Sequence, residues 1–367
     1  MFLKLLENIF GHFVERRNNS FNSNRIKRYK AKIPVISIGN ISVGGSGKTP
    51  FTIELAKLLL ENGIKPSVIG SGYKGKSSGG FIVSDGKQIF ADASQAGDEM
   101  ILIAHKVNVP VVIHQKKYEA AKIVENHFKV DVILIDDGFQ HRFLQRDLDI
   151  VLIDSKTLEQ PFLLPRGRLR EPLKSLKRAD IICLYSQNDY IKIADYIRKD
   201  AEVFYISTKN DGVYNFNDYC SFFSRFCNSE QIEKSYSPEE KNLMNCYPIT
   251  QIDEEKNIFF KTNENFASIS SIAQPERFFN SIKDFNLIHN FIFRDHHQYS
   301  EKNVNSIIRN CKKKGISNIL TTEKDAVKLH RYKELFDKHL IFVYVFSIKI
   351  DIFNFQKLTD IVLKTFH

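Results

Sequence analysis

The chain has 367 residues, of which 43% are hydrophobic and 26% charged, and it carries a formal net charge of +10. This composition is ordinary for a globular protein with room for two domains, and it excludes a disordered or membrane-spanning chain. The positive balance favours anionic partners such as nucleotides, phosphorylated substrates or phospholipid surfaces, whereas no signature of nucleic-acid binding is present and no obligate protein partner is inferred.

Residues 1–32 are expected to form an amphipathic helix followed by basic residues. One helical stripe collects Phe2, Leu3, Leu6, Ile9, Phe10 and Phe13. Lys4 and Glu7 interrupt the apolar run, so the segment cannot span a bilayer. Clustered cations follow between Arg16 and Lys32. Two interpretations stay open: an interfacial helix on an anionic membrane, and an ordinary amphipathic helix packed on the domain.

A phosphate-binding loop is predicted at residues 41–50, which read ISVGGSGKTP. Its glycines allow backbone N–H groups to approach an anion, Lys48 reaches the β- and γ-phosphates, and the Thr49 hydroxyl ligates Mg²⁺. Ser42 stands where the standard pattern has its first glycine. The apolar run before the loop and the amphipathic stretch after it favour a phosphate site over a glycine-rich turn without a ligand. The expected nucleotide-binding residues are Gly44, Gly45, Ser46, Gly47, Lys48 and Thr49.

Strand-like apolar runs alternate with helical or loop segments over residues 33–207. This alternation predicts an α/β fold with a doubly wound, mostly parallel sheet, in which ligands bind beyond the carboxyl ends of the strands. Residues 208–265 are more polar and show no clear period, so we expect a connector or insertion there. The alternation resumes over residues 266–367, which predicts a second, smaller α/β lobe.

Two pairs of carboxylates are candidate functional groups. An apolar strand that ends in Asp136 and Asp137 has the Walker B form, and its carboxylates can hold Mg²⁺ directly or through water. The alternative is a pair that only caps the next helix, and the phosphate loop favours the metal role. Asp98 and Glu99, in the stretch AGDEM, taken alone read as a helix N-cap and a first-turn acid.

Two further stretches carry basic or titratable groups. PRGRLREP at residues 165–172 is either a solvated basic loop or a clamp for an anionic substrate, because arginine donors fork onto phosphate. FRDHHQY places Asp295 beside His296 and His297. A metal site would need further ligands, and an Asp–His unit for acid–base chemistry is at least as compatible with this pattern.

The ordered set of motifs resembles the tetraacyldisaccharide 4'-kinase family, the lipid A 4'-kinases of Gram-negative bacteria. The resemblance covers residues 1–190 and 266–330, through ISIGNISVGGSGKTP, GDE, IDDGFQHR, LREPLKSLKRAD, PERFF, DHH and TTEKDAVKL. It implies a P-loop NTPase-like fold and transfer of the ATP γ-phosphate, with Mg²⁺, to the 4'-hydroxyl of a lipid A disaccharide 1-phosphate precursor. It also implies a peripheral location at the cytoplasmic face of the inner membrane, where residues 1–32 become a docking segment on the anionic surface.

The resemblance also implies roles for individual residues. Asp98 would be the catalytic residue that accepts the hydroxyl proton, with its charge and orientation set by a histidine of the DHH motif, most simply His296 rather than His297. The Walker B pair, Asp136 and Asp137, would hold Mg²⁺ with the loop threonine. The residues expected to line the site are Glu99, His141, Arg170 and Glu171.

The sequence departs from the usual family pattern at Ser71, where arginine is more common, so a contact of that arginine is lost or passes to Lys74. SSIAQPERF similarly replaces SGIANPERF. Two alternative functions are a switch-type P-loop NTPase and a soluble small-metabolite kinase. Guanine recognition favours [NT]-K-x-D, a spacing that TTEKD does not have, and a small-metabolite kinase would not need the apolar and basic segment at residues 1–32.

Overall fold

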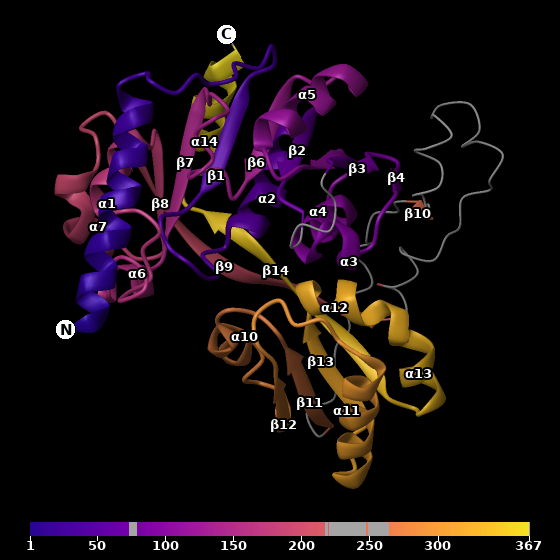
Figure 1. Cartoon of the computed structure of the whole chain (residues 1–367). Helices are drawn as coiled ribbons and strands as arrows, with labels where there is room; N and C mark the ends of the chain where they lie inside the picture. The colour runs from indigo at the N-terminus through magenta and orange to yellow at the C-terminus, as the bar shows by residue number, and fades with distance from the viewer. Residues whose placement is uncertain (73–78, 217–218, 220–246, 249–263, 367) are drawn as a thin grey trace.

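The computed structural model describes residues 1–72, 79–216, 219, 247–248 and 264–366 (Figure 1). Within these described residues, the strands form one 14-stranded sheet in the order β10-β4-β3-β5-β2-β6-β1-β7-β8-β9-β14-β13-β11-β12. The strands are β1 Val35–Gly39, β2 Pro66–Gly70, β3 Phe81–Asp85, β4 Gln88–Ile89, β5 Pro110–Ile113, β6 Val132–Asp136, β7 Leu148–Ile153, β8 Ile181–Leu184, β9 Glu202–Asn215, β10 Tyr247–Pro248, β11 Asn265–Ser270, β12 Asn286–Ile292, β13 Asn318–Thr322 and β14 Phe342–Ile352. The helices are α1 Phe2–Asn22, α2 Lys48–Glu61, α3 Ala93–Ala96, α4 Asp98–Lys106, α5 Lys117–His127, α6 Ser155–Glu159, α7 Asn188–Ile193, α10 Pro275–Ser281, α11 Glu301–Lys313, α12 Glu323–Leu329, α13 Lys333–Lys338 and α14 Phe355–Leu363.

The first half of the sheet, from β10 to β9, confirms the predicted doubly wound arrangement. Strands β5, β2, β6, β1, β7, β8 and β9 run parallel to one another. Every residue of β1, β2, β6, β7 and β8 is buried, as expected for parallel strands that helices cover on both faces. Strands β3 and β4 extend this half with antiparallel pairing, which the sequence analysis did not predict.

The second half of the sheet, from β14 to β12, joins the first through the antiparallel pair β9 and β14. Pairing runs from Tyr344 opposite Asn215 to Ile352 opposite Ile206. The first residues of β9 also pair with β8, and the first residues of β14 also pair with β13. Strands β9 and β14 therefore link the two halves. The predicted connector at residues 208–265 therefore begins inside β9, and most of its remainder lies outside the described residues.

The C-terminal helix α14 returns to the first half of the sheet (Figure 1). The backbone N–H of Phe353 donates to the carbonyl of Tyr205 at 2.8 Å, and Lys357 Nζ lies 2.5 Å from Glu202 Oε2. Strand β14 runs toward the first half, so it carries the chain out of the second half before α14 begins. The described residues 266–366 thus contribute to both halves.

Helix α1 is docked mainly along its C-terminal part, with a further contact at Glu7, whose carboxylate lies 3.0 Å from Arg166 Nη1. Apolar side chains of its N-terminal part are exposed. Phe21 is buried, and Asn18 Nδ2 donates to a Glu171 carboxylate oxygen at 2.7 Å. The exposed apolar side chains are Met1, Phe2, Leu3, Leu5, Ile9 and Phe13. In the described part of the chain, no helix combines the length and the apolar character needed to cross a membrane. The docked-helix interpretation holds for the C-terminal part, and membrane association stays a prediction for the other part.

Candidate functional site

A cavity of about 720 Å³ lies between the carboxyl ends of the first-half strands and the second half of the sheet. The phosphate loop after β1, the end of β6 and Tyr185 after β8 line one side. Residues 272–274, several residues of α10, Asp295 and His296 line the other side. A doubly wound sheet binds its ligands at this edge, and the volume suits a small-molecule ligand.

The loop before α2 has the backbone conformation of an anion site. Gly44 and Gly47 have φ angles of 104° and 79°, which favour glycine over residues with a side chain. Gly47 is the N-cap of α2, and no side chain caps this helix. The N–H groups of the first turn therefore lack intrahelical partners and are available to phosphate oxygens, with the positive end of the helix dipole behind them.

Asp136 and Asp137 lie beside this loop. The Asp136 carboxylate accepts a hydrogen bond from Thr49 Oγ1 at 3.2 Å. Asp137 contacts two cations, Lys48 Nζ at 3.5 Å and Arg170 Nη1 at 2.9 Å. Its φ of 53° is uncommon for a residue with a side chain, and such backbone conformations cluster at functional sites.

The same oxygen atoms fit a magnesium ion. Asp137 Oδ1 is buried and accepts no hydrogen bond from the described residues, and hard oxygen ligands suit Mg²⁺. Burial raises the pKa of Asp136 although Lys48 opposes the shift. Burial also acts on Asp137, but the charges of Lys48 and Arg170 outweigh it and hold the pKa of that carboxyl well below its usual value. A bound divalent cation would keep both carboxylates ionised.

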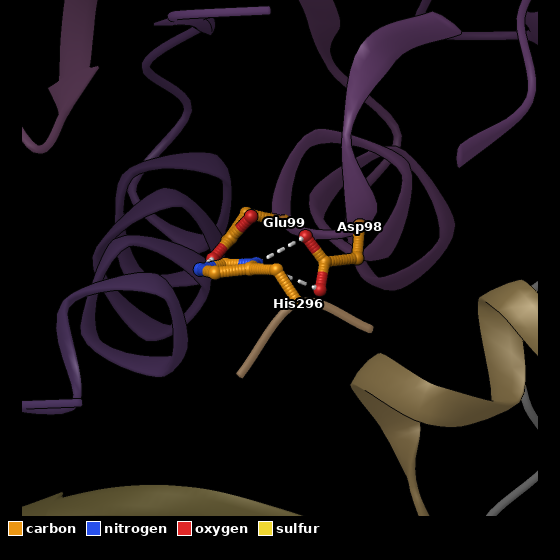
Figure 2. A group of neighbouring side chains, drawn as sticks. All are labelled: Asp98, Glu99 and His296. Carbon is orange, nitrogen blue, oxygen red and sulfur yellow. Dashed lines mark hydrogen bonds and ion pairs between the residues drawn. The ribbon is translucent and has the colours of Figure 1, made fainter. Parts of the chain in front are cut away.

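Across the cavity, Asp98, Glu99 and His296 form a cluster that joins the two halves of the sheet (Figure 2). His296 Nδ1 lies 3.1 Å from Asp98 Oδ1, and His296 Nε2 lies 3.7 Å from Glu99 Oε1. Gly97, not Asp98, is the N-cap of α4, so the capping interpretation of Asp98 is wrong. Asp98 is 2% exposed and does not line the cavity, whereas His296 does.

Burial, hydrogen bonds and nearby charges shift the pKa values of the cluster. Burial raises the pKa of Asp98, but hydrogen bonds and the charges of Lys324 and Lys328 outweigh it, and the pKa lies well below its usual value. The hydrogen bond with Asp98 raises the pKa of His296, against the opposing effect of burial. Burial raises the pKa of Glu99 although Lys324 Nζ lies 2.6 Å away. Because two lysines already supply the positive charge, an acid–base pair fits this cluster better than a metal site.

The other predicted histidines lie outside the cavity lining. His297 stacks on Phe293 with ring centroids 4.7 Å apart, and its Nε2 lies 3.2 Å from Asn303 Oδ1. Of the two adjacent histidines, His296 is therefore the one at the cavity. Burial and the nearby charge of Lys117 lower the pKa of His141 to about 4, so this imidazole is neutral at physiological pH.

Arg170 and Glu171 are neighbours in sequence but point to different places. Arg170 lines the cavity beside the Walker B pair, as expected. Glu171 is 1% exposed, and Arg178 donates to both of its carboxylate oxygens, at 2.8 and 3.1 Å. With the hydrogen bond from Asn18, this pairing holds α1 against the basic loop. Glu171 is thus absent from the described cavity lining, contrary to its predicted place.

Three lysines of the site were not predicted. Lys117 Nζ donates to the Asp136 carbonyl at 3.1 Å, and burial lowers the pKa of this amine to about 8. Lys324 and Lys328 come from α12 and contact the carboxylates of the cluster. The two α12 lysines lie inside TTEKDAVKL, so the motif carried a signal, whereas Lys117 lies in no recognised motif. Ser71 lines the cavity, and Lys74 lies outside the described residues.

This arrangement defines a P-loop phosphotransferase, because the loop and its aspartates suit a nucleotide while a histidine faces them across the cavity. The family model described as tetraacyldisaccharide-1-P 4'-kinase matches residues 1–367, and the chain belongs to that family.

Individual relatives match nearly the whole chain. A tetraacyldisaccharide 4'-kinase of Halothermothrix orenii is 34% identical over 99% of this chain and 91% of its own length. The enzyme of that name from Pelodictyon phaeoclathratiforme is 33% identical over 96% of this chain and 93% of its own length. Among solved structures, LpxK from Aquifex aeolicus in complex with ATP is 27% identical with a TM-score of 0.71, and the match covers 99% of this chain and 98% of that one. The same fold and the same family therefore extend over the full length.

The buried position of Glu171 predicts a structural role. Glu171→Ala is expected to lower the free energy of unfolding by about 3 kcal/mol, because it leaves Arg178 without its partner in a mostly buried place. Urea unfolding followed by circular dichroism measures this change. The exposed Glu61 on α2 is the control, and Glu61→Ala should change the free energy of unfolding by less than about 0.5 kcal/mol. If Glu171→Ala left stability unchanged and weakened substrate binding, Glu171 would have a role in the site instead of the predicted structural role.

Proposed function

We propose that this protein transfers the γ-phosphate of ATP to the 4'-hydroxyl of the tetraacyldisaccharide 1-phosphate precursor of lipid A. The observation that carries the proposal is one cavity in which the phosphate loop faces the Asp98–His296 pair. Phosphoryl transfer to a sugar hydroxyl needs a site for the nucleotide phosphates and a group that takes the hydroxyl proton. Family membership favours the lipid acceptor over a small metabolite, and the spacing in TTEKD argues against a guanine-nucleotide switch.

The nucleotide phosphates are proposed to bind the backbone N–H groups of residues 44–47 and the first turn of α2. Lys48 offsets negative charge on the β- and γ-phosphates, which grows on the leaving group during transfer. Thr49, Asp136 and Asp137 are proposed to hold Mg²⁺, which supplies further charge neutralisation at the same phosphates. The hydroxyl and carboxylate oxygens described above support the Mg²⁺ ligands. The ATP complex of the Aquifex aeolicus relative supports the nucleotide.

The hydroxyl proton is proposed to leave through the Asp98–His296 pair as a unit. The family resemblance implied Asp98 as the acceptor, but Asp98 is buried and is absent from the described cavity lining, whereas His296 is part of that lining. His296 Nε2 therefore takes the proton from the 4'-hydroxyl, and ionised Asp98 stabilises the imidazolium through Nδ1. A carboxylate in this position also fixes the orientation of the ring, because it accepts the hydrogen bond at Nδ1.

The function is tested by transfer of ³²P from labelled ATP to tetraacyldisaccharide 1-phosphate in detergent micelles. Wild-type protein should phosphorylate the lipid, and Lys48→Ala should lose at least about 100-fold in kcat because charge on the leaving phosphates is no longer neutralised. Lys57→Ala is the control, because Lys57 lies on the same helix and pairs only with Glu54 among the described residues. Turnover of ATP with small sugars but not with the lipid would favour the metabolite-kinase alternative.

The proton-transfer proposal predicts a specific pH dependence. The reactive form of His296 is neutral and its pKa is raised, so kcat should rise with pH through an apparent pKa above the ordinary histidine value of about 6.5. Asp98→Asn should lower kcat by at least about 100-fold and move this apparent pKa downward, because the imidazolium loses its anionic partner.

The measurement is kcat against pH at saturating substrates for wild type, Asp98→Asn and His297→Ala. His297 is the control, since it faces Phe293 and Asn303 instead of the cavity, and its replacement should leave the apparent pKa unchanged. An identical apparent pKa in wild type and Asp98→Asn would show that the Asp98–His296 pair does not govern the titration.

We also propose that the N-terminal part of α1 holds the protein on the anionic cytoplasmic face of the inner membrane of a Gram-negative bacterium. Its exposed side chains include Phe2 at 71% and Phe13 at 65%, and basic residues follow them in the chain. Bulky apolar groups that enter the lipid interface, together with cations beside anionic headgroups, give such reversible binding. The protein would then be held at the membrane surface in which a lipid acceptor resides.

The membrane proposal is tested with vesicles of phosphatidylglycerol and phosphatidylethanolamine. The double variant Phe2→Ser/Phe13→Ser should bind at least about tenfold more weakly in co-sedimentation, since each buried phenylalanine contributes about 1.5–3 kcal/mol. Phe353→Ser removes an equally exposed phenylalanine, at 75%, beside α14 and should bind as the wild type does. Equal binding by all three proteins would leave α1 with its docking role alone.

A further inference from the structure

Residues 271–277, which lead from β11 into α10, contact both sides of the cavity. At the start of this segment, the carbonyl of Ser271 accepts a hydrogen bond from the backbone N–H of His296 at 3.1 Å. The Ser271 N–H donates to Asp325 Oδ2 at 2.9 Å, and the Ser271 hydroxyl accepts a hydrogen bond from Lys328 Nζ at 2.6 Å. The segment is thus fixed directly beside the histidine that faces the cavity.

The end of the same segment is bonded to the phosphate loop. Gln274 Nε2 donates to the Gly45 carbonyl at 3.2 Å, and Arg277 Nη1 donates to the same carbonyl at 3.4 Å. A side chain at Gly44 or Gly45 would begin 3.9 Å from the Cβ of Ala273, which shows how closely the segment covers the loop. The two hydrogen bonds come from PERFF and the residue before it, a motif to which the proposed nucleotide and proton steps assign no role. Both Gln274 and Arg277 also line the cavity.

A buried carboxylate of the first half orients both donors. Asp154 is 1% exposed and caps α6, where it accepts hydrogen bonds from the backbone and hydroxyl of Thr157. Its second oxygen accepts from Gln274 Nε2 at 3.0 Å and lies 3.6 Å from Arg277 Nη2. Hydrogen bonds to a charged acceptor are about twice as strong as neutral ones. The segment is therefore held by a rigid, charged anchor as well as by the loop.

We propose that Gln274 and Arg277 are positioning residues that fix the distance between the phosphate loop and His296. The inference rests on the proposed kinase function. The path between the two reaction partners is short: Gly45 carbonyl, the side chains of Gln274 and Arg277, the segment backbone, and the Ser271 carbonyl bonded to His296. A misplacement of about 1 Å between reacting groups can cost an enzyme about 100-fold in rate.

This role differs from nucleotide binding in its kinetic signature. Both side chains bind a carbonyl oxygen of the loop, which cannot itself bind a phosphate, so the loop N–H groups keep their access to ATP when either side chain is lost. A positioning residue therefore lowers kcat and leaves the KM for ATP unchanged, whereas a nucleotide ligand raises KM. The Asp98–His296 contact also stays intact, so the apparent pKa of the kcat profile does not move.

The test compares Arg277→Met and Gln274→Leu with wild type in the lipid phosphorylation assay. We expect kcat to fall at least about tenfold in each variant, with the KM for ATP within about twofold of wild type and an unchanged apparent pKa. Arg277→Met is the decisive variant if Gln274→Leu fails to fold, because the Arg277 side chain is 40% exposed. The matched controls are Arg309→Met on α11 and Gln356→Leu on α14, both distant in sequence from the segment and the loop.

The possible outcomes separate cleanly. A kcat of Arg277→Met within about twofold of wild type overturns the inference, and so does a raised KM for ATP with unchanged kcat. An equal loss in the controls also overturns it, because the effect would then not depend on the segment. A wild-type protein without transfer activity overturns the proposed function and this inference together, whereas an active wild type with unaffected variants overturns the inference alone.

Discussion

Pairing of β9 with β14 determines whether the site exists, because the groups that face each other across the cavity come from opposite halves of the sheet. His296 follows Asp98 by 198 residues and meets it only when these two strands are in register. An ion pair reinforces the junction: Lys106 Nζ lies 2.8 Å from Glu323 Oε1 and 3.5 Å from Asp211 Oδ2, which joins α4, α12 and β9. Such buried charges add little net stability, yet removal of one partner is costly, so they specify this docking more than they strengthen it.

Around the cavity, positive and negative side chains alternate before any ligand arrives. Asp137, directly after β6, faces Lys48, and Lys117 binds the Asp136 carbonyl. The carboxylates of α4 face the lysines of α12. Neighbouring acids titrate apart: burial raises the pKa of Asp136, whereas the charges of Lys48 and Arg170 lower that of Asp137. Perturbed pairs of this kind are typical of functional sites, where charge is arranged in advance of the reaction. Under the proposed function, a nucleotide triphosphate would therefore meet side-chain charges that are already arranged around the cavity.

Local patterns predicted what local physics determines. The parallel strands are continuous apolar runs buried on both faces, and they stand out in the sequence, whereas β3 is partly polar and β4 has two residues, so neither has a recognisable period. The phosphate loop has its own spacing, but the pairing of Asp98 with His296 came from resemblance to a family, because no local pattern relates such distant residues. Lys117 enters the site only through long-range packing. Glu171 was expected in the cavity lining together with its sequence neighbour Arg170, which belongs there. The Glu171 side chain instead points toward α1 and binds Asn18.

The attachment of α1 bears on how shortened forms of the protein should be interpreted. Asn18 donates a hydrogen bond to Glu171. The residue before Glu171 is Arg170, which pairs with Asp137 beside the phosphate loop. Deletion of the first helix therefore removes Asn18, a partner of the buried Glu171 carboxylate. Glu171 is adjacent in sequence to Arg170, which contacts the nucleotide site. An inactive truncated protein would confound loss of membrane contact with disturbance of the loop. Point substitutions on the exposed face of the helix separate the two effects. Detergent-solubilised substrate would not restore activity that is lost through disturbance of the loop.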